Sequence, residues 1–117
     1  MRNNLHAGLT IRLFTDRKAF GPGVAELLCR VRETHSLRAA ALNMEMAYSK
    51  AWKIVKNAEE CLDCKLLSTA IGGKNGGGAT LTPAAERLLA AYDAYCEAVN
   101  TYAAEHFAEH FSFFDGD

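Results

Sequence analysis

The sequence lacks an apolar run long enough to cross a membrane, and its first residues lack the apolar core of a signal peptide. A membrane-spanning helix needs about 18 or more consecutive apolar residues, and no stretch of this chain reaches that length. Residues 1–6, Met-Arg-Asn-Asn-Leu-His, are mostly polar and do not have the character of a secretory leader. We therefore expect a cytoplasmic protein without a membrane partner.

The chain is also poor in patterns that would form a metal or catalytic site. Cys61 and Cys64 have the spacing of a redox or metal pair, but the sequence has no second such pair and no neighbouring histidine to complete a zinc set. Cys29 and Cys96 fall on apolar helical stripes, where cysteine acts as a small hydrophobic residue. No nucleophile–base pair or carboxylate cluster is evident. We expect no enzyme activity, no cofactor and no metal, with a metal or redox sensor at Cys61 and Cys64 as an alternative.

The charge is divided unevenly along the chain, although the net charge is only −1. Residues 1–82 contain 12 basic and 7 acidic side chains, whereas residues 83–117 contain one basic and 7 acidic side chains. Such asymmetry is typical of a chain in which one half faces nucleic acid and the other does not. We therefore distinguish a DNA-binding part over 1–82 from a dimerisation helix and tail over 83–117.

The N-terminal third predicts one strand and one helix. Residues 9–14 alternate apolar and polar side chains, as in a half-buried strand, and residues 16–23 are expected to form a turn-rich loop. Pro22 suits the first position of a helix that ends near Glu33 or Thr34. The predicted core face of that helix comprises Val24, Leu27, Leu28 and Val31.

Two helices separated by a tight turn are predicted next. Ser36 is a suitable N-cap for a helix over 37–43, and a break at 44–47 precedes a longer helix over 47–61. The expected buried stripe of the longer helix comprises Ala51, Ile54, Val55, Ala58 and Leu62. A separate polar stripe comprises Lys50, Lys53, Asn57 and Glu60. Two helices joined in this way form a helix-turn-helix, whose second helix can enter the major groove of DNA.

A glycine-rich loop over 72–78 joins two strand-like runs, 66–71 and 79–82. Five of its seven residues are glycine and one is Lys74, so its backbone can approach a partner closely while presenting one charge. A nucleotide phosphate loop would need a Lys-Ser/Thr pair that opens a helix, and Lys74 is followed by Asn75 and more glycine. We interpret the segment as a hairpin whose tip lies on a phosphate backbone; a tip with no role is the alternative.

A long helix is predicted from Pro83, with Thr82 as its N-cap, to about Phe111. Its apolar residues recur at alternating spacings of three and four, which is the pattern of a coiled-coil seam. The seam comprises Ala85, Leu88, Tyr92, Tyr95, Val99, Tyr102 and His106. A domain of this size cannot cover such a helix by itself, so we expect a homodimer through Leu88, Tyr92, Tyr95, Val99 and Tyr102.

The order of these elements predicts an α+β, mainly α, winged helix-turn-helix with a long C-terminal dimerisation helix. Residues 36–42, 46–52 and 72–83 resemble the helix-turn-helix, wing and linker-helix start of ModE-type molybdate-responsive regulators, relatives of the LysR group. The resemblance covers about 9–89 and implies a transcription regulator that binds double-stranded DNA. Full-length members carry C-terminal molybdate-binding domains, whereas this chain ends at Asp117, so we expect a stand-alone DNA-binding domain with no inherited oxyanion sensing and an unknown effector.

Three positions depart from the family pattern. Glu45 stands where the turn usually has glycine, Ala47 where the recognition helix usually begins with serine, and Ala85 where glycine is usual. A lost N-cap oxygen costs about 1 kcal/mol, and a non-glycine residue at positive φ adds strain. These departures favour an alternative function, a protein-interaction module of the same fold that uses its long acidic helix and binds DNA little.

The expected DNA contacts come from three segments. At the helix-turn-helix they are Ser36, Arg38, Tyr48, Ser49, Lys50 and Lys53, and at the wing they are Gly73, Lys74 and Asn75. A solvated helix face is the alternative for Lys50 and Lys53, and packing against the first helix is the alternative for Tyr48. Trp52 is expected in the core. Arg12, Arg17 and Lys18 lie on or beside the first strand, without an assigned role.

Overall fold

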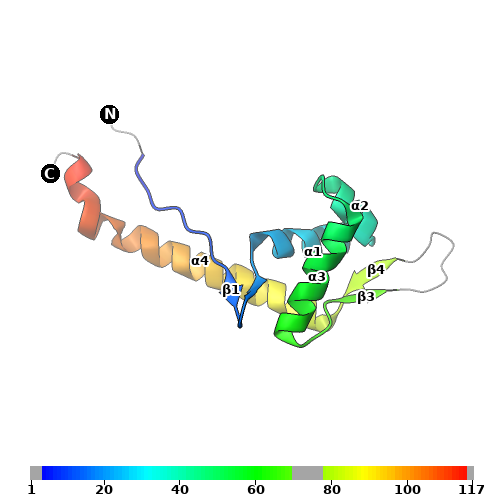
Figure 1. Ribbon diagram of the computed structural model, residues 1–117. Coiled ribbons are helices and arrows are strands. Elements are labelled where there is room, and N and C mark those ends of the chain that lie inside the picture. The colour runs from blue at the N-terminus through cyan, green and yellow to red at the C-terminus, as the bar shows by residue number, and fades with distance from the viewer. Residues whose placement is uncertain (1–3, 70–77, 116–117) are drawn as a thin grey trace.

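Helices dominate the chain, and a short antiparallel hairpin lies at each side of the third helix (Figure 1). The structure is a computed structural model that describes residues 4–69 and 78–115. Its elements are, in order, β1 Leu13–Phe14, β2 Lys18–Phe20, α1 Pro22–Thr34, α2 Leu37–Asn43, α3 Tyr48–Leu62, β3 Leu67–Thr69, β4 Ala79–Leu81, α4 Pro83–Phe111 and a 3₁₀ turn over Ser112–Asp115. This order confirms the predicted α+β, mainly α, winged helix-turn-helix.

The helix starts are where local sequence signals place them. Pro22 opens α1, and Pro83 opens α4. The hydroxyl oxygen of Ser36 accepts a hydrogen bond from the Ala39 amide, and that of Thr82 accepts one from the Ala85 amide. These bonds satisfy amides that have no partner inside a helix. The predicted bounds of α1, α2 and α4 are confirmed, and those of α3 differ by one residue.

The N-terminal segment differs from the prediction. The regular strand is only Leu13–Phe14, and it pairs with a second strand, Lys18–Phe20, inside the segment predicted as loop. Phe20 is fully buried and packs edge-to-face on Tyr92, with ring centroids 5.1 Å apart. This long-range aromatic contact fixes a strand that the short sequence Lys-Ala-Phe does not signal. The wing strands β3 and β4 pair antiparallel, with Leu67 opposite Leu81.

The core has two neighbouring clusters, one on each side of α1. The first joins the hairpin to α4 and comprises Phe20, Leu28, Ala58, Leu66, Ala85, Leu89 and Tyr92. The second joins α1, α2 and α3 and comprises Leu27, Val31, Ala40, Ala41, Ala51, Val55 and Ala79. Three alanines of the second cluster, Ala40 and Ala41 on α2 and Ala51 on α3, leave little side-chain bulk, so α2 and α3 can approach closely.

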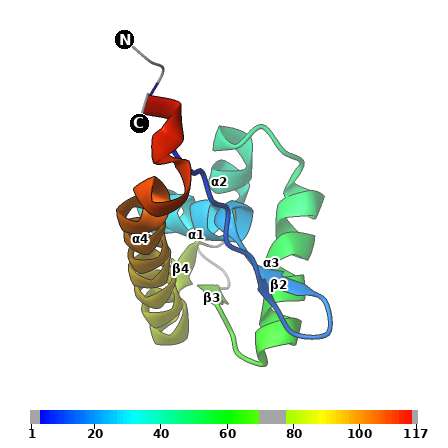
Figure 2. The ribbon, with the colours of Figure 1, turned by 90° about the vertical axis from the view of Figure 1, so that its left-hand side faces the viewer.

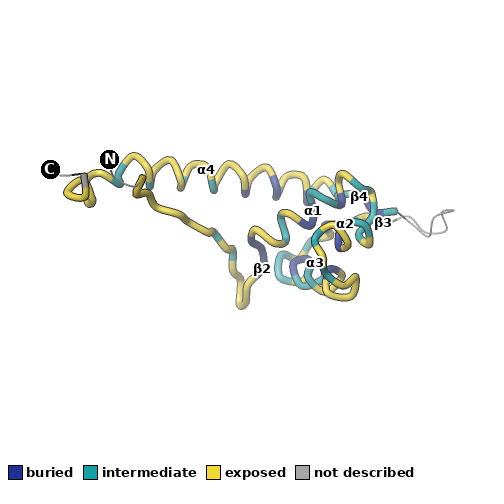
Figure 3. The backbone as a smooth tube through the Cα atoms, turned by 90° about the horizontal axis from the view of Figure 1, so that it is seen from above, coloured by how far each residue is buried: buried dark blue, intermediate teal, exposed yellow. Residues whose placement is uncertain are grey.

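The long helix α4 extends well beyond this core (Figures 1 and 3). Its first three turns contribute Ala85, Leu89 and Tyr92 to the interior, and the remainder is exposed or half-buried. Arg32 on α1 forms a two-pronged ion pair with Glu86, which ties the start of α4 to the domain. Within the described residues, every helix is too short or too polar to span a bilayer.

Candidate nucleic-acid interface

The turn between α2 and α3 is a Schellman motif, a helix ending in which two backbone amides fold back onto carbonyls of the last turn. The Glu45 amide donates to the Leu42 carbonyl, and the Met46 amide donates to the Ala41 carbonyl, each at 3.0 Å. Glu45 occupies the left-handed position of this motif, with φ 56°. Glycine is preferred there because a Cβ atom is strained at positive φ. The predicted strain at Glu45 is therefore located in the structure.

The recognition helix α3 begins without a side-chain cap. Ala47 is its N-cap residue and has extended backbone angles, but it offers no oxygen to the first amides. The expected loss of a serine cap is thus seen. The side chain of Tyr48 packs under Arg38 of α2, with the guanidinium carbon 4.3 Å from the ring centroid. This cation–π contact joins the starts of α2 and α3.

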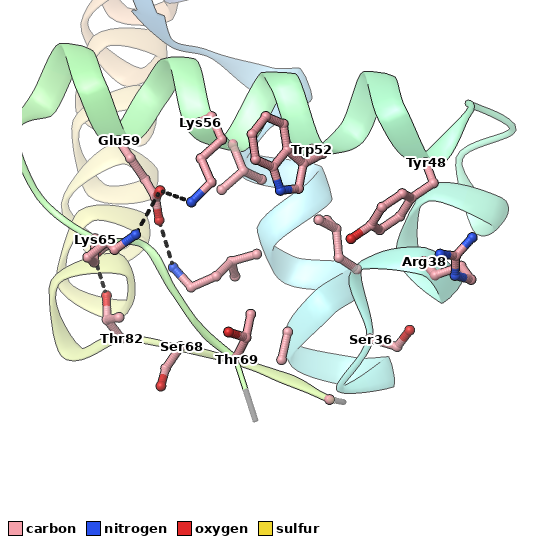
Figure 4. Close-up of a pocket in the computed structure, with 15 residues that line it drawn as sticks. Ser36, Arg38, Tyr48, Trp52, Lys56, Glu59, Lys65, Ser68, Thr69 and Thr82 are labelled. Carbon is pink, nitrogen blue, oxygen red and sulfur yellow. Dashed lines mark hydrogen bonds and ion pairs between the residues drawn. The ribbon is translucent and has the colours of Figure 1, made fainter. Parts of the chain in front are cut away.

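A groove of about 760 Å³ runs between α3, the start of α2 and the wing strands (Figure 4). Its lining includes Ser36, Arg38, Tyr48, Trp52, Lys56, Glu59, Lys65, Ser68, Thr69 and Thr82. Three of the predicted DNA-contacting residues, Ser36, Arg38 and Tyr48, therefore lie together in one groove. The Ser36 hydroxyl oxygen is also engaged in capping α2.

Trp52 lies in this groove and not in the core, so the prediction for it is wrong. It is 46% exposed, and the Lys56 ammonium lies 5.4 Å from its ring centroid. The reason is helical geometry: Trp52 follows the buried Ala51 by one residue, a rotation of about 100° that moves it off the buried stripe. The sequence did carry a signal for this placement, because position 52 is not part of the predicted buried stripe of α3.

Glu59 is the one charged side chain among the described residues that is buried, and it holds the floor of the groove. Its Oε2 atom accepts hydrogen bonds from the Leu66 amide at 2.8 Å and the Leu67 amide at 3.3 Å. Its Oε1 atom lies 3.3 Å from Nζ of Lys56 and 3.8 Å from Nζ of Lys65. Burial alone would raise the pKa of Glu59, but the two amides and Lys56 outweigh burial and hold the pKa below its ordinary value.

Sequence reasoning did not assign Glu59, Lys65, Ser68 or Thr69 to the site. Glu59 belongs to neither the apolar nor the polar stripe recognised in the helix, and its amide partners lie seven and eight residues further along the chain. A buried carboxylate that precedes a strand is a weak signal by itself.

Lys50 and Lys53 lie on the other flank of α3 and face the N-terminal hairpin. They line a cleft of about 430 Å³ with Arg12 and Lys18. The polar stripe is therefore not a free surface along its length, because its lower half is engaged: Arg17 donates to Asn57 at 2.7 Å and to Glu60 at 3.2 Å. The structure thus separates the predicted contacts into two sets on opposite flanks of α3, with Ser49 exposed at the helix start.

The predicted wing contacts Gly73, Lys74 and Asn75 lie outside the described residues. The strands that lead to them are in place, and Gly78 at the base of the wing is close to the body of the domain. A Cβ atom there would come within 3.1 Å of the His35 carbonyl oxygen, so this glycine permits the close approach of β4 to the end of α1.

The predicted dimer residues divide between the chain's own core and its exposed helix. Tyr92 differs from the prediction: it is only 7% exposed and donates a hydrogen bond to the Ile11 carbonyl at 2.6 Å, so it is used within its own chain. Leu88 is half-buried against the same core. Tyr95 and Tyr102 are 56% and 65% exposed, and Val99 between them is half-buried.

The four cysteines are free thiols and half-buried. Within the residues that the structure describes, no three histidine, cysteine or carboxylate side chains gather as a metal site would require.

Comparison with known proteins matches residues 24–86, more than half of the chain, to bacterial regulatory helix-turn-helix proteins of the lysR family. The chain is 44% identical over 68 residues to the molybdenum-pterin-binding protein MopB of Rhodobacter capsulatus, which covers 58% of this chain and 25% of that protein. It is 39% identical over 72 residues to the transcriptional regulator ModE of Haemophilus influenzae, covering 62% and 28% of the two chains. It is 30% identical over 90 residues to the dual regulator ModE of Escherichia coli K12, covering 76% and 34%. The chain thus spans between a quarter and about a third of the length of these relatives.

Proposed function

The chain belongs to the lysR family of bacterial regulatory helix-turn-helix proteins, and on that premise we propose that it binds double-stranded DNA sequence-specifically as a homodimer. In this proposal α3 enters the major groove, α2 approaches the backbone with Arg38, and the wing with Lys74 follows a neighbouring phosphate run. The family consists of regulators and not of enzymes, so the site is a binding surface.

The observation that carries the proposal is the outer face of α3. Ser49, Trp52 and Lys53 are exposed on it, while Ala51, Val55 and Ala58 on the opposite face are buried. A helix that is anchored on one face and presents polar, basic and aromatic groups on the other can contact base edges and phosphates together. Lysine contacts with phosphates would supply affinity that depends on salt.

The proposed dimer uses the second half of α4. The helix has 29 residues, which at about 1.5 Å per residue gives a length of about 43 Å. Tyr95, Val99 and Tyr102 recur at spacings of four and three, so they lie on one face that this chain leaves largely exposed. A second copy would bury them and place the two α3 helices on half-sites about one turn of DNA, or a multiple of it, apart.

Selection of bound sequences from a random DNA pool tests both parts of the proposal. A symmetric consensus is the expected result, and light scattering should give the mass of two chains. Replacing Tyr95 and Tyr102 together by glutamate should yield monomers that keep the helical content of the folded domain. A pool without enrichment would refute sequence-specific binding, and a single-chain mass for the unmodified protein would refute the dimer.

A protein-interaction module is the second candidate function, and two observations favour it. Glu45 is held at positive φ, and Ala47 leaves α3 without a side-chain cap. The helix-turn-helix is therefore less stable than it would be with glycine at position 45 and serine at position 47. In addition, α4 presents acidic side chains and exposed tyrosines to solvent. Such a module should show little affinity for random duplex DNA even at about 50 mM salt, whereas a DNA-binding domain should bind there and lose affinity steeply by about 200 mM.

A further inference from the structure

The cleft between α3, β2 and the start of α1 is a second basic surface, separate from the wing groove. Its lining residues are Arg12, Lys18, Ala19, Gly21, Pro22, Gly23, Val24, Lys50, Lys53, Ile54 and Asn57. Four of these are basic and none is acidic. The cleft and the wing groove lie on opposite flanks of α3, because the β1–β2 hairpin and the β3–β4 wing stand on either side of that helix (Figures 1 and 3).

The hairpin is held against α3 by a fixed set of hydrogen bonds. The Asn57 side-chain amide donates to the Lys18 carbonyl at 3.0 Å, and Arg17 donates to Asn57 and Glu60. Figure 2 shows the hairpin lying across the lower part of α3. Arg12 and Lys18 are thereby brought beside Lys50 and Lys53, although 32 to 41 residues separate them in the sequence. The position of the hairpin therefore determines the cleft.

The lining of the cleft, drawn from the described residues, includes no carboxylate. Asp16 in the hairpin turn and Glu60 on α3 are both within 4 Å of Arg17. Among the described residues, none of the four cleft cations forms an ion pair. Four like charges around one cleft create a positive potential that favours an anion.

We propose that this cleft holds a phosphate of the DNA backbone, on the strand opposite the one that the wing follows. The inference rests on the proposed DNA binding and adds the N-terminal hairpin to the interface. A helix about 10–12 Å across that lies in a major groove about 12 Å wide has a phosphate chain along each flank. The wing groove faces one chain, and the Arg12–Lys18 cleft faces the other. The hairpin precedes the family match at 24–86, so the match does not assign this contact.

The test uses a double substitution on the hairpin, Arg12→Gln with Lys18→Gln, and leaves the recognition helix intact. The matched control is Arg30→Gln with Arg87→Gln, which removes the same charge from residues that line neither groove nor cleft. Binding to a mixed-sequence duplex is measured by fluorescence anisotropy from about 50 to about 200 mM salt. Circular dichroism of both variants is compared with that of the unmodified chain to test whether they keep the fold.

Removal of two phosphate contacts should lower the slope of log affinity against log salt by about 2. The affinity lost across this salt range should therefore be about tenfold smaller for the hairpin variant than for the unmodified chain. The control should keep the slope of the unmodified chain. A hairpin variant with an unchanged slope would overturn the inference and leave the proposed function standing, whereas an unmodified chain that does not bind DNA would overturn both.

A second arm separates a DNA phosphate from a free oxyanion. The chain without DNA is titrated with inorganic phosphate while the backbone amide resonances of the cleft residues are followed. Little shift is expected at concentrations below about 1 mM, because an exposed cleft binds one free anion only weakly. Saturation in that range, together with an unchanged DNA salt slope, would mean that the cleft is a small-anion site and would overturn the assignment to the DNA backbone.

Discussion

Glu59 is predicted to contribute more to stability than any other carboxylate in the described part of the chain. Glu59→Ala removes the acceptor of the Leu66 and Leu67 amides, and the Leu66 residue is fully buried. A hydrogen bond to a charged group contributes about 1.5–3 kcal/mol, and an unsatisfied buried donor costs a similar amount. The Leu67 bond is longer and less buried, so we expect a total loss of about 3 kcal/mol.

Glu59→Gln tests the contribution of the negative charge separately from that of the hydrogen-bond acceptor. Glutamine keeps an oxygen for the two amides but places an NH₂ group next to Lys56 and Lys65, so we expect a smaller loss of about 1–2 kcal/mol. Urea unfolding followed by circular dichroism at neutral pH measures both changes. Glu26→Gln is the control, because it disrupts only an exposed pair with Arg30 and should change stability by less than about 0.5 kcal/mol. An alanine variant within that margin of the unmodified chain would refute the role assigned to Glu59.

The pH dependence provides an independent check. The pKa of Glu59 is lowered by folding, so the folded state favours the charged carboxylate. Its contribution to the free energy of unfolding is therefore fully present above the ordinary carboxyl value of 4.5 and is lost as the pH falls through the lower folded value. The Gln variant should lose less stability than the unmodified chain over this acidic range, and parallel pH profiles for the two proteins would contradict this explanation.

Three further predictions concern single local features. Glu45→Gly should stabilise the domain by about 0.5–1 kcal/mol, because glycine accepts φ 56° without strain, whereas Glu45→Ala should leave the urea midpoint nearly unchanged. Ala47→Ser should add about 1 kcal/mol by capping α3, and a serine variant no more stable than the unmodified chain would show that the first amides of α3 are already satisfied. Tyr92→Phe removes the hydrogen bond to the Ile11 carbonyl and should cost about 1 kcal/mol in the same assay, with faster amide exchange along β1 and β2 as the local signature.

The features that the sequence predicted well are those with local causes. Pro22, Ser36 and Thr82 mark helix starts because the groups they satisfy lie within three residues. The unbroken length of α4 was predictable because no glycine or proline interrupts the helix after Pro83 as far as Phe111. The positive φ of Glu45 followed from the family pattern and not from the side chain, which has no preference for that geometry.

The features that escaped prediction have partners far away in the sequence. The contact between Arg17 and Asn57 spans 40 residues, and that between Tyr92 and Ile11 spans 81. These contacts decide that β2 exists, that Tyr92 is internal and that Lys50 faces the hairpin. Periodicity along one segment reports which face is buried but not which neighbour covers it, so the two flanks of α3 could not be told apart from sequence.

Two sets of side-chain hydrogen bonds clamp α3, one on each flank, and they explain how the chain tolerates a weak start to this helix. Near its C-terminal end, Glu59 binds the helix to the strand of the wing, while Asn57 and Glu60 bind it to the hairpin on the other flank. Both clamps act through side chains on the last two turns of α3, whereas the strained Glu45 and the uncapped Ala47 lie at its start. The side-chain hydrogen bonds that orient the helix therefore lie in its C-terminal half. Its N-terminal half is held by the buried Ala51 and by the contact between Tyr48 and Arg38, so the weak helix start lowers the stability of the domain without releasing α3.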